Sequence, residues 1–156
     1  HEAKLNEAGS FKYKTKSGRT VYGGGGITPD IYIPYKNSIN LETSKIVRNA
    51  KRPIFNFASK FSSKQKNTFN SFLNFKENWI VNDSLFNSFL DNLSQDSIFV
   101  NLDSIVLDNE YIRNSIKSEI AGSIWGKDEA ANIRLQLDNQ VVEALKHFNE
   151  ADAFLD

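Results

Sequence analysis

The spacing of hydrophobic residues along the chain changes from a period of two to a helical period near residue 40. Aromatic or β-branched residues alternate with lysines over 11–16, which predicts a strand with one solvated face. A Ser-Gly turn signal and a short strand over 19–22 complete a predicted hairpin, and a third extended run follows over 30–33. From residue 40 onward, apolar residues recur at steps of three and four. The pattern predicts an α+β, predominantly α, fold with a short N-terminal β segment followed by a bundle of about six helices.

Capping residues predict where these helices begin and end. Pro53 interrupts the first helical stripe and should break it near Arg52. A Ser-x-x-Gln sequence over 62–65 is typical of a capping box. The segment 101–107 has no sustained helical stripe, so we expect a connector there. The predicted N-cap aspartates are Asp83, Asp108, Asp128 and Asp138.

One helix is predicted with particular clarity. Isoleucines stand at four-residue steps and so share one helix face. Gly126 follows this stripe in the position of a C-terminal capping glycine. The isoleucines are Ile112, Ile116, Ile120 and Ile124.

These elements predict a division of the chain into three parts. We expect residues 1–10 to be a disordered lead, 11–36 a β segment, and 40–150 a helical domain. A short β segment with solvated lysines is marginally stable by itself. We therefore expect residues 11–34 to need a sheet from elsewhere, and otherwise to be disordered or to self-associate by strand addition.

The composition of the chain excludes cysteine-based functional sites and gives no sign of a membrane span. The chain has 156 residues and contains neither Cys nor Met. The absence of Cys excludes disulfides, thiolate metal sites and cysteine nucleophiles. A chain without an initiator Met is expected to be a processed product or an excised fragment, and we favour a fragment. No apolar run of about 18 residues is present, so no membrane span is expected.

The formal net charge of zero hides an asymmetry between the two halves. Residues 1–70 hold 13 Lys and Arg against 4 Asp and Glu, a net charge of +9, and residues 71–156 have a net charge of −9. A basic half can indicate nucleic-acid binding. Here no recognition motif accompanies the lysines, so we favour complementary halves that face each other or a third surface, and expect no nucleic-acid partner.

The four consecutive glycines at 23–26 raise three interpretations: a turn between strands, a peptide-contacting loop, or a phosphate cradle. A phosphate loop needs Gly-Lys-Ser/Thr at the start of a helix. Here Ile-Thr-Pro-Asp and an extended run follow the glycines. The turn is the favoured interpretation.

No catalytic, cofactor-binding or metal-ligating residue is predicted. A serine nucleophile needs a base and oxyanion donors. Ser10 and Ser17 lie in predicted turns and Ser123 in a predicted helix, so each is interpreted as an ordinary serine. His1 and His147 are the only imidazoles, and His147 is expected at the surface or at its boundary. The adjacent acids Asp128 and Glu129 suit the first turn of a helix.

A Ser-Gly-Arg turn over 17–19 is followed by a Gly-x-Gly-Ile-x-Pro-Asp element over 24–30. On these motifs, the segment 11–34 resembles the end of the catalytic domain of carboxy-terminal (tail-specific) processing peptidases. That family has an aromatic-rich strand, a Ser-Gly-Arg turn, a short strand and a Gly-x-Gly-Ile-x-Pro-Asp element. The matching residues are Ser17, Gly18, Arg19, Gly24, Gly26, Ile27, Pro29 and Asp30.

The helical remainder is similar, more loosely, to a C-terminal extension carried by some members of that family. The shared features are a Phe-Ala pair, a Trp-Gly helix end and an Asp-led final helix with an Ala-Leu pair. These residues are Phe57, Ala58, Trp125, Gly126, Asp138, Ala144 and Leu145.

The resemblance implies a parent protein that is a bacterial serine endopeptidase with a Ser-Lys dyad and a PDZ domain, periplasmic or otherwise extracytoplasmic. No residue here matches the nucleophile or lysine motifs, so the chain alone is expected to be inactive. Its implied partners are the upstream peptidase and PDZ domains and the polypeptide substrates of the parent. The alternative is a stand-alone helical protein-interaction module without peptidase activity.

Overall fold

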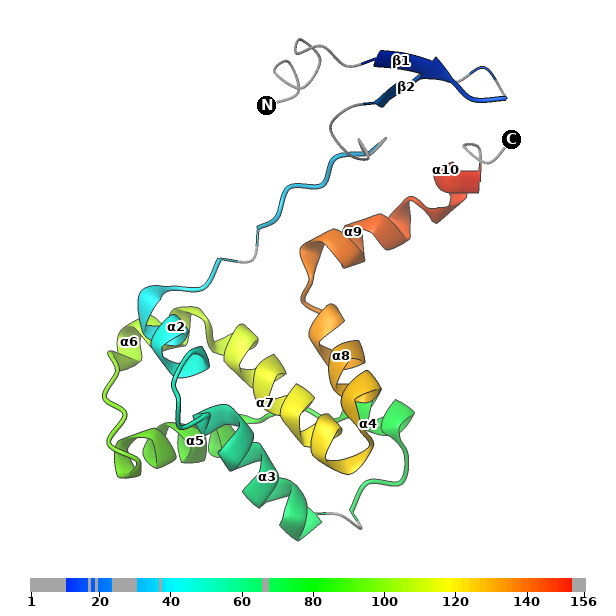
Figure 1. The fold of residues 1–156 in the computed structure, drawn as a ribbon. Helices are drawn as coiled ribbons and strands as arrows, with labels where there is room; N and C mark the ends of the chain where they lie inside the picture. The colour runs from blue at the N-terminus through cyan, green and yellow to red at the C-terminus, as the bar shows by residue number, and fades with distance from the viewer. Residues whose placement is uncertain are drawn as a thin grey trace. The chain divides into compact units, whose positions relative to one another are not determined.

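The computed structural model describes residues 11–16, 18, 20–23, 31–36, 38–65 and 68–152 (Figure 1). The chain divides into two units. We call Lys36–Val142 the helical unit, and the two chain ends, His1–Tyr35 with Glu143–Asp156, the terminal unit. The predicted lead over 1–10 lies outside the described residues.

The described residues are mostly helical, which confirms the α+β, predominantly α, class. They form nine helices and one antiparallel pair of strands. The elements are β1 (Phe11–Lys14), β2 (Thr20–Gly23), α2 (Leu41–Val47), α3 (Pro53–Gln65), α4 (Phe72–Asn78), α5 (Asp83–Gln95), α6 (Leu102–Leu107), α7 (Asn109–Ile124), α8 (Lys127–Leu135), α9 (Asn139–Lys146) and α10 (Phe148–Asp152).

The N-terminal hairpin forms as its alternating pattern predicts. β1 and β2 are antiparallel, with Phe11 opposite Gly23 and Lys14 opposite Thr20. All four residues of β1 are exposed. The predicted third strand is wrong for its described part, because residues 31–33 pair with no strand. Pro34, which follows them, has no N–H to give to a ladder.

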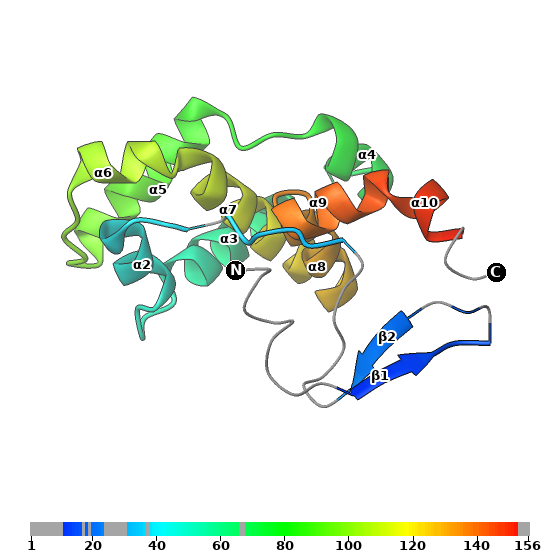
Figure 2. The ribbon, with the colours of Figure 1, turned by 90° about the horizontal axis from the view of Figure 1, so that it is seen from above.

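The isoleucine stripe organises the helical unit. Ile112, Ile116 and Ile120 are completely buried on α7, and Ile124 is partly buried at its end. α7 packs between α3 and α8, which Figures 1 and 2 show from two directions. The prediction for this helix is confirmed, including its end before Gly126, which has φ +132°.

Asparagine and serine, more than aspartate, begin the helices. The side chains of Asn40, Ser71, Asn82 and Asn101 each accept a hydrogen bond from the amide three residues on, at the starts of α2, α4, α5 and α6. Asp138 caps the start of α9 as predicted, because its Oδ1 accepts from the amides of the second and third residues after it.

Four boundary predictions are wrong. Asp83 is the first residue of α5, not its cap, and Asp128 lies inside α8. Ser62 is buried within α3, where its hydroxyl donates to the Ala58 carbonyl, so no capping box forms. Segment 101–107 is the cap and helix α6, not a connector. Asp108 does precede α7, but its carboxylate makes no cap bond there.

Helices α2 and α6 are joined by polar bonds at their ends. Asn40 donates its backbone N–H to Asp108 Oδ2 at 2.8 Å and its side-chain amide to the Ser104 carbonyl at 2.6 Å. In the other direction, Asn101 donates its backbone N–H to Glu42 Oε2 at 3.1 Å. Each helix therefore helps to satisfy backbone groups that the other leaves unpaired.

Aromatic rings fill the corner where α3, α4 and α7 end. Phe75 stacks on Trp79 with ring centroids 4.8 Å apart, and its centroid is 5.1 Å from that of Trp125. Phe69 lies edge-on to both Phe75 and Trp79. The remaining rings that join this aromatic cluster are those of Phe61 and Phe72.

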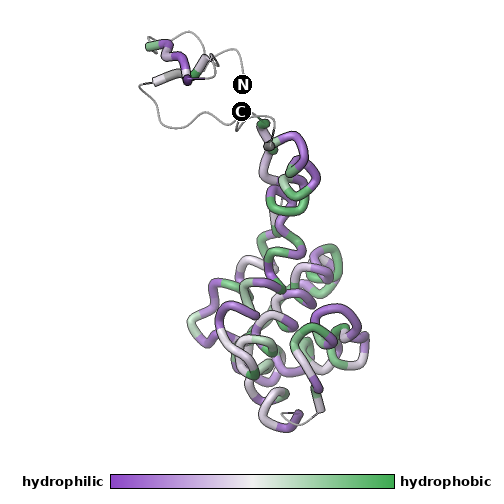
Figure 3. Tube along the Cα trace, turned by 90° about the vertical axis from the view of Figure 1, so that its right-hand side faces the viewer, coloured by the Kyte–Doolittle hydropathy of each residue, from purple (hydrophilic) through white to green (hydrophobic). Residues whose placement is uncertain are grey.

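Hydrophobic and hydrophilic residues alternate around the helices, as the colours of Figure 3 show. This is the pattern of helices with one buried face. Within the described part of the chain, no helix has both the length and the apolar character needed to cross a membrane.

Candidate functional site

Of the eight residues that carry the peptidase resemblance, only Gly18 falls within the described residues. It has φ +85°, and its N–H donates to the Thr15 carbonyl at 3.0 Å. This is a turn that favours glycine, as the hairpin requires. The other seven lie outside the described residues, as does the rest of the glycine run after Gly23.

The residues considered for catalysis are spread over the chain. Ser123 donates to the Glu119 carbonyl, one turn back on α7, as helical serines commonly do. His147 lies near Glu143 and Glu150, with Nδ1 3.1 Å from Glu150 Oε2. Asp128 and Glu129 stand in the first turn of α8. Ser10, Ser17 and His1 lie outside the described residues.

No candidate metal centre is present among the residues that the structure describes. They contain no group of three or more His, Asp or Glu side chains placed to hold an ion.

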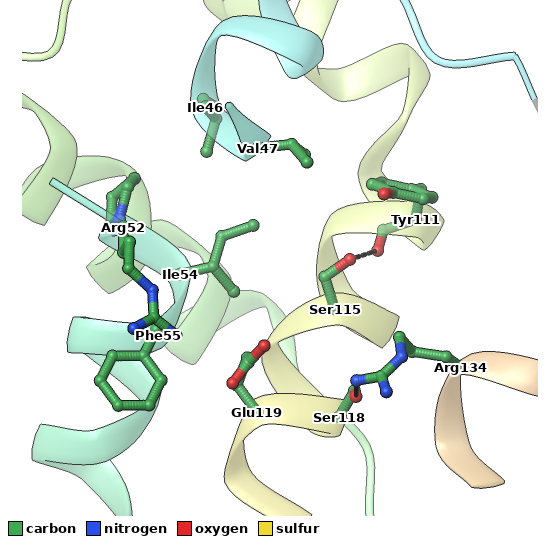
Figure 4. Close-up of a pocket in the computed structure, with 11 residues that line it drawn as sticks. Ile46, Val47, Arg52, Ile54, Phe55, Tyr111, Ser115, Ser118, Glu119 and Arg134 are labelled. Carbon is green, nitrogen blue, oxygen red and sulfur yellow. Dashed lines mark hydrogen bonds between the residues drawn. The ribbon is translucent and has the colours of Figure 1, made fainter. Parts of the chain in front are cut away.

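A groove in the helical unit is the best-formed candidate for a binding site. It has a volume of about 230 Å³ and lies where α2, the start of α3, α7 and α8 meet (Figure 4). One part of its wall is apolar and another is polar or charged. Its lining residues are Ile46, Val47, Arg52, Pro53, Ile54, Phe55, Tyr111, Ser115, Ser118, Glu119 and Arg134.

Arg52 is held at the groove by unusual backbone geometry. It has φ +48°, a conformation that non-glycine residues seldom adopt. Because the helical conformation is disfavoured before a proline, Arg52 remains outside α3, while its carbonyl accepts the helical bond from Asn56 at 3.0 Å. Its guanidinium lies 4.2 Å from the centroid of the Phe55 ring, which orients the side chain.

Arg134, on α8, is oriented by a short chain of hydrogen bonds. Its Nη1 donates to Ser118 Oγ at 3.0 Å, and that hydroxyl donates to the Ala130 carbonyl at 2.8 Å. Ser118 is only 1% exposed, so this hydroxyl is fixed in the interior. One N–H of the guanidinium is thus used for positioning, and others remain to bind a ligand.

Glu119 lies between the two arginines in the view of Figure 4. Within the described residues, its carboxylate makes no hydrogen bond or ion pair. The groove therefore presents two cations and one anion beside an apolar wall. This arrangement can bind an anionic group by charge-assisted hydrogen bonds, but it offers no nucleophile paired with a base.

The groove could not be predicted from the sequence, because its residues come from two consecutive pairs of helices, α2 with α3 and α7 with α8, that are well separated in the chain. One local signal was available: an arginine directly before a proline at a helix start, with an aromatic residue three positions later. The hydrogen bond between Arg134 and Ser118 joins α8 to α7, so it exists only after these two helices have packed together.

The described chain is therefore a helical domain with a small charged groove and an attached β-hairpin. Residues 46–126 match a family of unknown function, DUF8443, over just more than half of the chain, and the chain belongs to that family. The matched segment includes Arg52, Glu119 and the aromatic cluster, and it ends before Arg134. No curated protein and no solved structure matches the chain.

Proposed function

We propose that this chain is a non-catalytic C-terminal region of a bacterial carboxy-terminal processing serine endopeptidase. One observation carries the proposal. The segment that resembles the end of the catalytic domain includes a two-stranded ribbon whose aromatic side chains Phe11 and Tyr13 are 71% and 57% exposed. Such a ribbon is marginally stable in water. Further strands of a larger sheet would stabilise it, and the catalytic domain of the parent would supply them.

The proposal assigns a role to each part of the parent protein. A lysine-activated serine in the upstream part attacks a peptide carbonyl near the C-terminus of a substrate. The helical unit braces that domain or shapes the access of polypeptide substrates to it. The PDZ domain is the second intramolecular partner, and the location is periplasmic or otherwise extracytoplasmic. These assignments are supported by the resemblance over residues 11–34.

The decisive experiment begins with the coding sequence upstream of residue 1. The proposal requires a peptidase core there, with a serine followed by a lysine in the family motifs. A sequence without that core contradicts the proposal. The present chain alone should cleave no peptide.

The longer protein then separates the two roles of the helical unit. Bracing predicts that deletion of the helical unit, residues 36–142, lowers the melting temperature of the catalytic domain. Control of access predicts an unchanged melting temperature and an altered range of cleaved substrates. A deletion that changes neither quantity contradicts both roles.

A second candidate is a stand-alone interaction module. It is favoured by exposed apolar side chains on the helical unit, since large exposed apolar patches mark interaction sites. Phe99 is 82% and Leu41 72% exposed, and the two line one surface groove with Lys45 and Arg48. This candidate predicts an upstream sequence without a peptidase core.

A further inference from the structure

We propose that the groove between α2, α3, α7 and α8 binds an extended acidic segment of another polypeptide. Two carboxylate side chains of that segment pair with Arg52 and Arg134, and an apolar side chain lies against the Ile54 and Val47 wall. This inference stands independently of the proposed function, since it uses only the groove and its charges.

The two arginines are oriented before any ligand arrives. Arg52 stacks on Phe55 at 4.2 Å, and Arg134 is bound to the buried hydroxyl of Ser118 at 3.0 Å. Pre-orientation reduces the conformational entropy lost on binding, so more of the interaction energy contributes to affinity. Guanidinium groups bind carboxylates through paired, charge-assisted hydrogen bonds.

The arrangement of the charges favours a peptide over a single small anion. Arg52 and Arg134 lie on opposite sides of Glu119 in Figure 4. An extended peptide projects alternate side chains to one face, so two acidic residues can address both arginines. Its backbone N–H groups lie between those side chains, and one of them can donate to the Glu119 carboxylate.

The size of the groove also favours a peptide ligand over a small molecule. Its volume of about 230 Å³ is below the ~300–1,000 Å³ usual for sites that enclose a small molecule. It can hold a few side chains of a segment that continues across the surface. The apolar wall then contacts the side chain two positions before the acidic pair, which an extended peptide projects to the same face.

The test is calorimetric titration of the full chain at low ionic strength. The probe is an acetylated and amidated peptide of sequence ALDLEA, with the neutral peptide ALNLQA as its matched control. We expect saturable binding of ALDLEA, at least tenfold weaker binding of ALNLQA, and loss of affinity as salt is added. Sodium glutarate should bind at least tenfold more weakly than ALDLEA.

Three substitutions locate the binding. Arg52→Gln and Arg134→Gln should each weaken ALDLEA binding about tenfold, the effect of losing one charge-assisted contact. Glu119→Gln keeps an acceptor but removes the repelling charge, so it should strengthen binding about threefold. Arg52→Gly should also lose affinity while keeping or raising the melting temperature, because glycine adopts φ +48° without strain. It therefore separates loss of binding from loss of folding.

Several outcomes would overturn the proposal. These are no binding of ALDLEA, equal binding of the two peptides, or arginine variants that bind as tightly as the wild type. Equal affinity for glutarate would assign the groove to small acids. Weaker binding by Glu119→Gln would mean that the groove recognises a cation.

Discussion

Gly126 is the residue on which the joint between α7 and α8 depends. Its backbone has φ 132° and ψ 179°, a region that is almost confined to glycine. A Cβ at this position would also lie 3.3 Å from Glu129 Oε2. The chain thus reverses between two packed helices through a conformation that other residues enter only with strain.

Gly126→Ala should lower the free energy of unfolding by about 2 kcal/mol. Urea denaturation of the full chain measures this, and Lys127→Ala is the control, because Lys127 is the exposed neighbour at the start of α8. The control should change the stability by less than about 0.5 kcal/mol. Equal effects of the two substitutions would show that the glycine conformation carries no special strain.

Lys117 on α7 places an amine in a partly apolar environment. Its Nζ donates to the Lys76 carbonyl at 2.8 Å and lies 5.6 Å from the centroid of the Phe75 ring. Burial lowers the pKa of this amine below the value usual for an exposed lysine. Between the lowered pKa and the usual lysine pKa, the unfolded chain therefore binds more protons than the folded one.

The stability of the wild type relative to Lys117→Met should rise as the pH increases through that window, because ΔG of unfolding increases with pH wherever the unfolded state holds more protons. Parallel denaturant titrations of both proteins between neutral pH and pH ~10 test the sign. A difference that falls with increasing pH would mean that the hydrogen bond and the ring outweigh burial and raise the pKa.

Predictions at single residues succeeded where one interaction decides the outcome. The Asp138 cap and the Gly126 helix end are set by local backbone geometry. The choice between Asn82 and Asp83 is different, because both residue types cap well and stand next to each other. Ser62 shows the same ambiguity, since a serine can cap a helix or donate to a carbonyl one turn back within it.

At the scale of elements, α7 is the centre of the helical unit. Three of its isoleucines are fully buried between α3 and α8. Ile120→Ala should lower the free energy of unfolding by about 2–5 kcal/mol, the cost of lost burial plus a cavity. Thermal or urea unfolding measures this.

Ile80→Ala is the matched control, because Ile80 is 70% exposed in the connection between α4 and α5. It should alter stability by less than about 0.5 kcal/mol. A loss at Ile120 as small as that at Ile80 would contradict the central role of α7.

The length of a helix decides whether the periodicity of its hydrophobic residues can predict it. The stripe of α7 is long and regular, so it identified the helix from sequence. Helix α6 has only six residues. Besides its buried Ile105 and its own Asn101 cap, it is held by bonds to the start of α2, including those of Asn40 and Glu42. A short helix held by distant partners has too little local pattern to predict. The groove as a whole has no such pattern, because packing alone brings Arg52 and Arg134 to one place. Only the Arg-Pro start of α3, with Phe55 three positions after Arg52, is visible in the sequence.

On the scale of the whole molecule, the buried core formed by the described residues lies within the helical unit. Every residue of the main hydrophobic cluster falls between Ile46 and Ile133. Within this unit, Lys36 donates its backbone N–H to Asn139 Oδ1 at 3.0 Å, near its two ends. We therefore expect the helical unit to fold without the terminal unit.

A fragment of residues 36–142 should melt within about 4 °C of the full chain, a shift worth less than about 1 kcal/mol. Circular dichroism during heating measures it. A fragment of residues 36–126 is the control: it lacks α8 with the buried Ile133 and should melt at a clearly lower temperature. A large loss in the 36–142 fragment would show that the terminal unit stabilises the core.

The aromatic cluster also determines which part of the structure tryptophan fluorescence can monitor. The chain has two tryptophans, Trp79 and Trp125, and both contact the Phe75 ring in that one corner. Selectively excited tryptophan fluorescence therefore originates from a single site in the helical unit. A change of this emission spectrum on denaturation therefore records the opening of the junction of α3, α4 and α7.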